Sequence, residues 1–302
     1  MNLQVSPKNL RSHKQSTTIR QQLGICVFCL AAGLSYRVGG LLPSIELETY
    51  FLSGLSGFLF ACTFLSKRSL SLERYWHIPF AFSVFSLSGL LDLVLTHGFV
   101  VTVLDQTPTA TNPIASTVIG TILAQLVSTL SIVVPVILLT IWSKMGLKSI
   151  FIDREKIWKG LRVGIIGFVI FYLLTLSGLL QSLFPNNGIT PSRFLTLTPA
   201  ILILVLSNGL REEFWFRGLF LKKYGRFLGP LSSNVLQATV FALFHLQVQY
   251  TQFLLVFLGF TFVLGLWLGY LMKESGNILG PAIFHAGADI PIYLVFLTNL
   301  SP

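Results

Sequence analysis

Long apolar stretches, separated by short breaks that carry charges, prolines or glycines, run through this chain of 302 residues. Each stretch is long enough to cross a bilayer and too uniformly apolar to be an alternating strand. Only helices and closed barrels satisfy their backbone hydrogen bonds in lipid. The sequence therefore predicts an all-α fold, a polytopic transmembrane helix bundle of about eight or nine spans. We place these spans at residues 21–42, 49–66, 77–98, 114–142, 160–184, 196–221, 231–246, 252–272 and 278–298.

Composition supports the same conclusion. Hydrophobic residues make up 53% of the chain and charged residues only 11%, whereas a typical soluble domain has about 25% charged residues. The mean hydropathy is +0.75. The net charge of +10 does not indicate nucleic-acid binding, because the basic residues lie in the breaks and do not gather on one polar face. The expected surroundings are therefore a lipid bilayer and no nucleic acid.

The basic residues alternate from one break to the next. The tail at 1–20 and the breaks at 67–74, 143–162 and 222–229 are basic, and Lys273 follows in a later break, whereas the intervening breaks hold few basic residues or none. Positively charged loops stay in the cytoplasm. We therefore expect an integral protein of a prokaryotic plasma membrane, with a cytoplasmic N-terminus and the C-terminus outside.

The chain divides near residue 190, where a segment rich in proline and asparagine interrupts the apolar pattern. Residues 1–20 form the basic tail, residues 21–190 an N-terminal transmembrane half of unassigned role, and residues 191–302 the half with the chemistry. In the first half, Arg37 and Asp92 lie within apolar stretches. We interpret both as structural, either paired across helices or with Arg37 reaching to the membrane interface.

Ionisable residues within a span cost about 2.5–3.5 kcal/mol each on insertion scales, so they need a reason to be there. The sixth stretch contains the adjacent acids Glu212 and Glu213, which point about 100° apart on a helix. Glu213 and Arg217 have the spacing of an ion pair, and Asn208 stands four residues before Glu212. We predict that Glu213–Arg217 is a structural pair and that Glu212 faces a polar cavity as a general base.

Two later stretches add histidines at helical spacing. Phe241 and His245 share one helix face, and His285 and Asp289 share another. Each feature alone has a simpler explanation: a solvated helix end for the acids, or an interhelical hydrogen bond for each histidine. Their clustering in three of the last four stretches favours a functional site.

These three motifs resemble those of the CPBP, or Abi, family of intramembrane proteases, which includes the CAAX prenyl endopeptidases and bacteriocin-processing proteins. The family pattern is Glu-Glu-x-x-x-Arg, then Phe-x-x-x-His, then His-x-x-x-Asn or Asp. Here it is matched by Glu212 to Arg217, Phe241 to His245, and His285 to Asp289, within roughly residues 195–298.

The resemblance implies a membrane-embedded endopeptidase that cleaves a membrane-associated substrate, of the prenylated CAAX type or bacteriocin-like. Glu212 would activate a water with help from His245, and His285 and Asp289 would polarise the scissile carbonyl. Glu213, Arg217, Phe241 and Asn208 would support the site. An ionised aspartate cannot donate a hydrogen bond, so we interpret Asp289 as a residue that orients His285.

Other functions stay open. The favoured mechanism uses no cofactor, but Glu212, His245, His285 and Asp289 could instead bind zinc as a metalloprotease site. The chain could also be a non-catalytic peptide-binding or immunity protein, or a transporter with a proton relay, although it lacks an inverted repeat. The expected partner is a peptide or protein substrate in or near the membrane, and the sequence sets no oligomeric state. Because Glu212 lies near the basic break at 222–229, the sequence predicts a cavity that opens to the cytoplasm.

Overall fold

The computed structural model describes residues 18–106, 114–153, 157–180, 189–248, 251–298 and residue 300. Within these ranges the secondary structure is helical, which confirms the predicted all-α bundle. The long helices are α1 (Ile19–Gly39), α2 (Ile45–Arg68), α3 (His77–Gly98), α4 (Val118–Trp142), α5 (Ile157–Leu176), α6 (Pro191–Glu212), α7 (Leu219–Phe244), α8 (Leu254–Ser275) and α9 (Leu279–Thr298). The short ones are η1 (Glu73–Tyr75), η2 (Phe99–Val103), η3 (Leu147–Ile150) and η5 (Glu213–Gly218). Most of the predicted basic tail and part of the proposed boundary near residue 190 lie outside the described residues.

Eight of the described helical segments are long and apolar enough to cross a membrane. One of them, Pro191–Phe244, covers 54 residues and combines α6, η5 and α7. It bends sharply at Gly229, which has a φ of 79° and directly precedes Pro230. The bend folds the chain back, because the rings of Phe216 and Phe241 lie 5.2 Å apart, whereas a straight helix would separate them by about 37 Å. The predicted sixth and seventh spans are thus the two arms of this bent segment.

Polar residues fix where several helices begin. Thr18 and Gln21 form a reciprocal capping box at the start of α1. The Ser44, Thr117 and Thr190 side chains accept hydrogen bonds from backbone amides in the first turns of α2, α4 and α6. These caps satisfy amides that have no partner within their own helix.

Glycines allow the helices of the C-terminal half to pack closely. A Cβ atom on Gly164 of α5 would lie 2.4 Å from the Gly280 carbonyl oxygen of α9, and one on Gly209 of α6 would lie 2.4 Å from the Ala282 oxygen. Small residues are the usual means of close helix packing in membranes. Gly287 likewise packs on Phe168, as expected for the small residues between His285 and Asp289.

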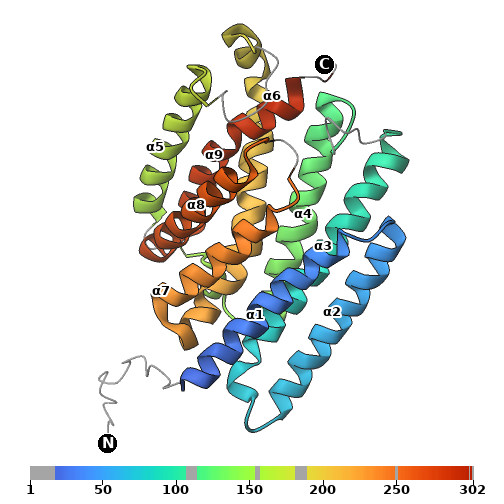
Figure 1. Ribbon diagram of the computed structural model, residues 1–302, viewed down its shortest axis with the longest axis vertical. Helices are drawn as coiled ribbons and strands as arrows, with labels where there is room; N and C mark the ends of the chain where they lie inside the picture. The colour runs from blue at the N-terminus through green and yellow to red at the C-terminus, as the bar shows by residue number, and fades with distance from the viewer. Residues whose placement is uncertain are drawn as a thin grey trace, which may run out of the picture.

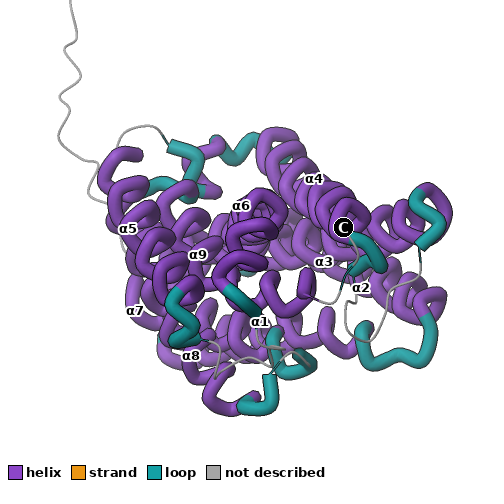
Figure 2. The backbone as a smooth tube through the Cα atoms, turned by 90° about the horizontal axis from the view of Figure 1, so that it is seen from above, coloured by secondary structure: helices purple, strands orange, loops and turns teal. Residues whose placement is uncertain are grey.

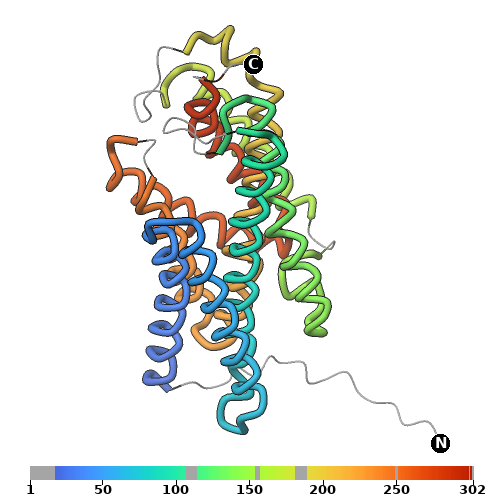
Figure 3. Tube along the Cα trace, turned by 90° about the vertical axis from the view of Figure 1, so that its right-hand side faces the viewer, coloured from blue at the N-terminus to red at the C-terminus, as the bar shows by residue number. Residues whose placement is uncertain are grey.

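Helix α6 lies near the middle of the bundle, with α9 on one side and α4 on the other (Figure 2). Helix α1 begins at one end of the molecule and α9 finishes at the opposite end (Figure 1). Helices α1 and α2 are displaced along the long axis relative to α9 (Figure 3). The central position of α6 brings its C-terminal end next to α3, α4, α7 and α9, which supply the side chains described below.

Candidate active site

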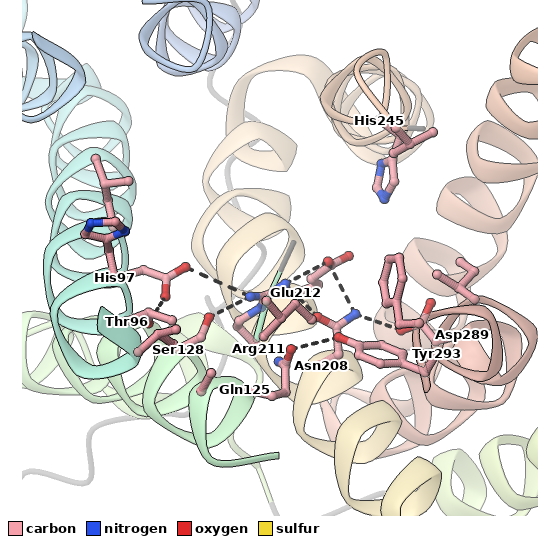
Figure 4. Close-up of a pocket in the computed structure, with 18 of the residues that line it drawn as sticks. Thr96, His97, Gln125, Ser128, Asn208, Arg211, Glu212, His245, Asp289 and Tyr293 are labelled. Atoms are coloured by element: carbon pink, nitrogen blue, oxygen red, sulfur yellow. Dashed lines mark hydrogen bonds and ion pairs between the residues drawn. The ribbon is translucent and has the colours of Figure 1, made fainter. Parts of the chain in front are cut away.

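The predicted site residues come from three separate segments that meet around one cavity of about 490 Å³. Glu212 ends α6, His245 follows α7, and Asp289 lies in the middle of α9. These three residues and Asn208 line the cavity (Figure 4). His285 lies one helical turn from Asp289 and is 2% exposed. The structure therefore brings together all four residues that the sequence singles out as catalytic.

Glu213 forms a sealed polar cluster behind the cavity. Its Oε1 accepts hydrogen bonds from the Arg217 guanidinium and from Nδ1 of His285, the latter at 2.8 Å. Neither Glu213 nor Arg217 is exposed. The guanidinium also lies over the Phe241 ring, 4.3 Å from its centroid. Glu213 and Arg217 are thus paired, as their spacing predicts, and Phe241 lies against the guanidinium.

Glu212 has a different environment, although it is the next residue along the chain. Its Oε1 lies 3.3 Å from the Arg211 guanidinium and 3.4 Å from the Asn208 amide nitrogen. Its Oε2 accepts no hydrogen bond from the described residues and lies 3.6 Å from Nε2 of His285. One carboxylate oxygen is therefore held in place, and the other can accept a proton.

His245 faces Glu212 across the cavity (Figure 4). Its Nδ1 lies 2.8 Å from the carbonyl oxygen of Phe241. A carbonyl only accepts hydrogen bonds, so Nδ1 carries the proton, and in the neutral ring Nε2 is left as an acceptor. The same Phe241 ring packs edge-on against both His245 and His285. Phe241 thereby fixes the relative orientation of the two imidazoles.

The structure changes the interpretation of Asp289. The nearest approach between Asp289 Oδ1 and His285 Nε2 is 3.7 Å, too long for a hydrogen bond. Glu213 orients His285 instead, because the Nδ1 side of the ring faces that carboxylate. Asp289 Oδ2 accepts a 2.8 Å hydrogen bond from the amide of Asn208. The interpretation that Asp289 orients His285 is therefore wrong, and Asp289 instead holds the side-chain amide of Asn208.

Helices α3 and α4 also contribute to the cavity, which sequence reasoning missed. The Arg211 guanidinium donates to Ser128 Oγ and Asn208 Oδ1, both at 2.6 Å, and lies 3.9 Å from Asp92. Tyr293 donates to Gln125 at the same cavity. The available signal was Asp92, a single charge in an apolar stretch, together with Arg211 beside the two glutamates. Arg37 does not pair with Asp92, since its guanidinium donates to Gln247.

A second, smaller cavity of about 140 Å³ lies on the other side of the histidines. His245, His285 and Asp289 contribute to its wall, and the rest of the lining is almost entirely apolar, from α5, α8 and α9. His245 therefore stands between the two cavities, and His285 borders the smaller, apolar one. This arrangement suits a peptide bond whose neighbouring group is apolar.

The zinc alternative requires the four candidate residues to converge on one ion. Within the described ranges, no group of three or more His, Cys, Asp or Glu side chains is placed to hold a metal ion. Nδ1 of His245 and Nδ1 of His285 are hydrogen bonded to protein oxygens, which leaves Nε2 of each ring as the nitrogen that could bind an ion. The mechanism proposed below uses no metal, and a chelation experiment tests the zinc version.

Comparison with known proteins supports the family assignment. Residues 194–291 match the family model described as type II CAAX prenyl endopeptidase Rce1-like. This segment contains all three motifs, and the match confirms the resemblance that they carry. No curated protein and no solved structure matches the chain. The matched segment is similar to membrane proteases of the CAAX endopeptidase type, a family of hydrolases that act on peptide substrates.

Proposed function

We propose that this protein is an intramembrane endopeptidase in which Glu212 activates the attacking water. The observation that carries the proposal is the position of the Glu212 side chain, which lines the cavity opposite His245 and whose Oε2 accepts no hydrogen bond from the described residues. A general base must reach the proton that it removes, and an oxygen without another hydrogen bond can do so. The substrate is a membrane-associated peptide or protein.

In this mechanism the water oxygen attacks the scissile carbonyl carbon, and its proton passes to Glu212. His245 Nε2 accepts a hydrogen bond from the same water and keeps it in position. The developing oxyanion receives the Asn208 N–H that otherwise makes the long 3.4 Å contact with Glu212, because Asp289 holds the other N–H. Nε2 of His285 donates to the oxyanion when the ring is protonated, since Nδ1 donates to Glu213. When the carbon–nitrogen bond breaks, the proton held by Glu212 passes to the leaving amine.

Glu213 and Arg217 have a supporting role in this proposal. They hold His285 from the side opposite the cavity and are closed off from solvent. Asp289 has the corresponding role for Asn208. Each group that contacts the substrate is thus fixed by a partner that does not, which is how active sites maintain their geometry.

The test compares membrane peptides from cells that produce the wild-type protein with those from cells that produce Glu212→Ala. We expect a set of cleaved peptides that appears only with the wild type and with the control Glu73→Gln, whose carboxylate is exposed and outside the cavity. Identical peptide sets in wild type and Glu212→Ala would contradict the mechanism and favour the non-catalytic binding protein. Cleavage by purified protein before and after chelation, with metal analysis, decides between the glutamate and zinc versions.

A further inference from the structure

The two ends of the bundle differ in charge. The described loops and helix ends at one end carry nearly all the basic residues, namely Arg20, Lys67, Arg68, Arg74, Lys144, Lys148, Lys159, Lys222, Lys223, Arg226 and Lys273. The opposite end carries Glu46, Glu48 and Asp105, with Arg37 and Arg193 as its described basic residues. By the positive-inside rule, the basic end is cytoplasmic and the opposite end faces outward.

The cavity extends from Glu212 toward the outward end. Its wall includes Ile45 at the start of α2, Val100 in η2, Ile114 before α4, Val248 after α7 and Phe296 near the end of α9. All five belong to the end that carries few basic residues. The remaining lining residues lie within helices at the level of Glu212 or between that level and this end.

In the other direction an aromatic cluster closes the path. It consists of Phe85, Trp215, Phe216, Phe220 and Tyr224, which are all buried. The rings of Phe85 and Trp215 stack at 4.5 Å, and the Trp215 indole donates to the Phe85 carbonyl oxygen. Since four of the five follow Glu213 along the chain toward Arg226, the cluster fills the space between the carboxylates and the basic end.

We infer that the catalytic cavity receives its substrate from the non-cytoplasmic face of the membrane. The substrate is then a peptide segment that emerges from the bilayer, or is anchored to it, on that face. This reverses the expectation, drawn from the short distance along the chain between Glu212 and the basic break, that the cavity opens to the cytoplasm. The inference takes the peptide substrate from the proposed function, but access to the cavity can be measured without any cleavage.

The residues that line the cavity also indicate which substrates fit it. Near the outward end it is largely apolar, and its floor holds three carboxylates and one guanidinium: Asp92 and Glu212 lie next to Arg211, and Asp289 lies beside Asn208. Excess negative charge at the floor disfavours an acidic residue next to the scissile bond. We expect an extended segment with apolar side chains on either side of the bond and no acidic residue beside it.

The experiment measures from which side the cavity can be labelled. The native cysteines are first replaced by alanine, and the full-length protein then receives one cysteine at a time: Ile292→Cys in the cavity wall, His97→Cys at its outer end, or Ser71→Cys in the basic break. Intact cells are treated with a charged, membrane-impermeant maleimide. We expect labelling of Ile292→Cys and His97→Cys in intact cells, and labelling of Ser71→Cys only after permeabilisation.

Two outcomes would overturn the inference. In the first, Ile292→Cys reacts only under the conditions that label Ser71→Cys, which means access from the basic side. In the second, Ile292→Cys reacts only after denaturation, which means that the cavity is closed to that side. Because the readout is alkylation, an inactive protein with outward labelling would refute the proposed function alone.

Discussion

Glu212 and Glu213 are neighbours in the chain but belong to two different regions of the molecule. Glu213 lies in a sealed region, where both of its contacts are protein groups and its side chain is fully buried. Glu212 lies in an open region, where one oxygen is held by Arg211 and Asn208 and the side chain lines a cavity. The comparison teaches that a carboxylate in a membrane can be retained either for the architecture or for the chemistry, and its access to a cavity distinguishes the two, since the Glu212 side chain is 13% exposed and the Glu213 side chain is not exposed.

The largest expected effect separates the two regions by activity. Glu212→Gln keeps the shape of the side chain but removes the base, so cleavage should fall by at least about 100-fold. The unfolding temperature in detergent should stay near that of the wild type, because Glu212 is not part of the sealed cluster. Peptide cleavage rates and thermal unfolding of the same preparation check this. A variant that cleaves at the wild-type rate would remove Glu212 from the mechanism.

The second effect concerns stability. Arg217→Met leaves the buried carboxylate of Glu213 without its cation, which should lower the free energy of unfolding by about 3–5 kcal/mol. Denaturant titration in mixed micelles measures the change, with Arg193→Met at the partly exposed start of α6 as the control. If Arg217→Met were as stable as the wild type yet inactive, Arg217 would belong to the catalytic machinery and the sealed region would lose its distinct role.

A smaller effect is expected at Asp289, where two substitutions should differ. Asp289→Ala removes the acceptor that holds the Asn208 amide, a hydrogen bond to a charged group worth about 1.5–3 kcal/mol, or roughly 10- to 100-fold in rate. Asp289→Asn keeps a carbonyl oxygen for that bond and should retain most of the activity. Cleavage rates of the two variants check this. Equal losses would show that the negative charge of Asp289, and not its hydrogen bond, matters.

The smallest effect is expected for the contact between the N-terminal half and the open region. Asp92 and Arg211 are 3.9 Å apart, and both side chains are 20% exposed. Pairs that water can reach contribute about 0–1 kcal/mol, so Asp92→Asn should lower the cleavage rate less than about fivefold. Steady-state kinetics would measure it. A loss as large as that of Glu212→Gln would mean that α3 takes a direct part in catalysis.

Much of the fold was predictable because each span is recognisable in the sequence by its length and its apolar character. The grouping of Glu212, His245, His285 and Asp289 was also predictable, since their spacing places them on helix faces and their motifs resemble a family. The direction in which each side chain points was not. Between Glu213 and Gly218 the helix widens into a π-turn, which resets the helix faces beyond it.

The side-chain pairings that the sequence did not predict depend on contacts between helices that lie far apart in the chain. Gly209 lets α6 rest directly on the backbone of α9 near Ala282, and between the same two segments Nδ1 of His285 meets Glu213. No local pattern encodes such a contact between residues so far apart in the chain. For the same reason, the pairing of Asp92 with Arg211 in place of Arg37 could not be read from two isolated charges.

The bend at Gly229 has a consequence for the surrounding lipid. Between Pro230 and Phe244 the returning arm of α7 rises only about 22 Å, whereas the hydrocarbon core of a typical bilayer is about 30 Å thick. Such hydrophobic mismatch is relieved when the adjacent leaflet becomes thinner. His245 follows directly after this short arm, so a thinned leaflet brings the headgroup region and its water toward the imidazole. We therefore expect the acyl-chain length of the surrounding lipids to change how much water reaches His245.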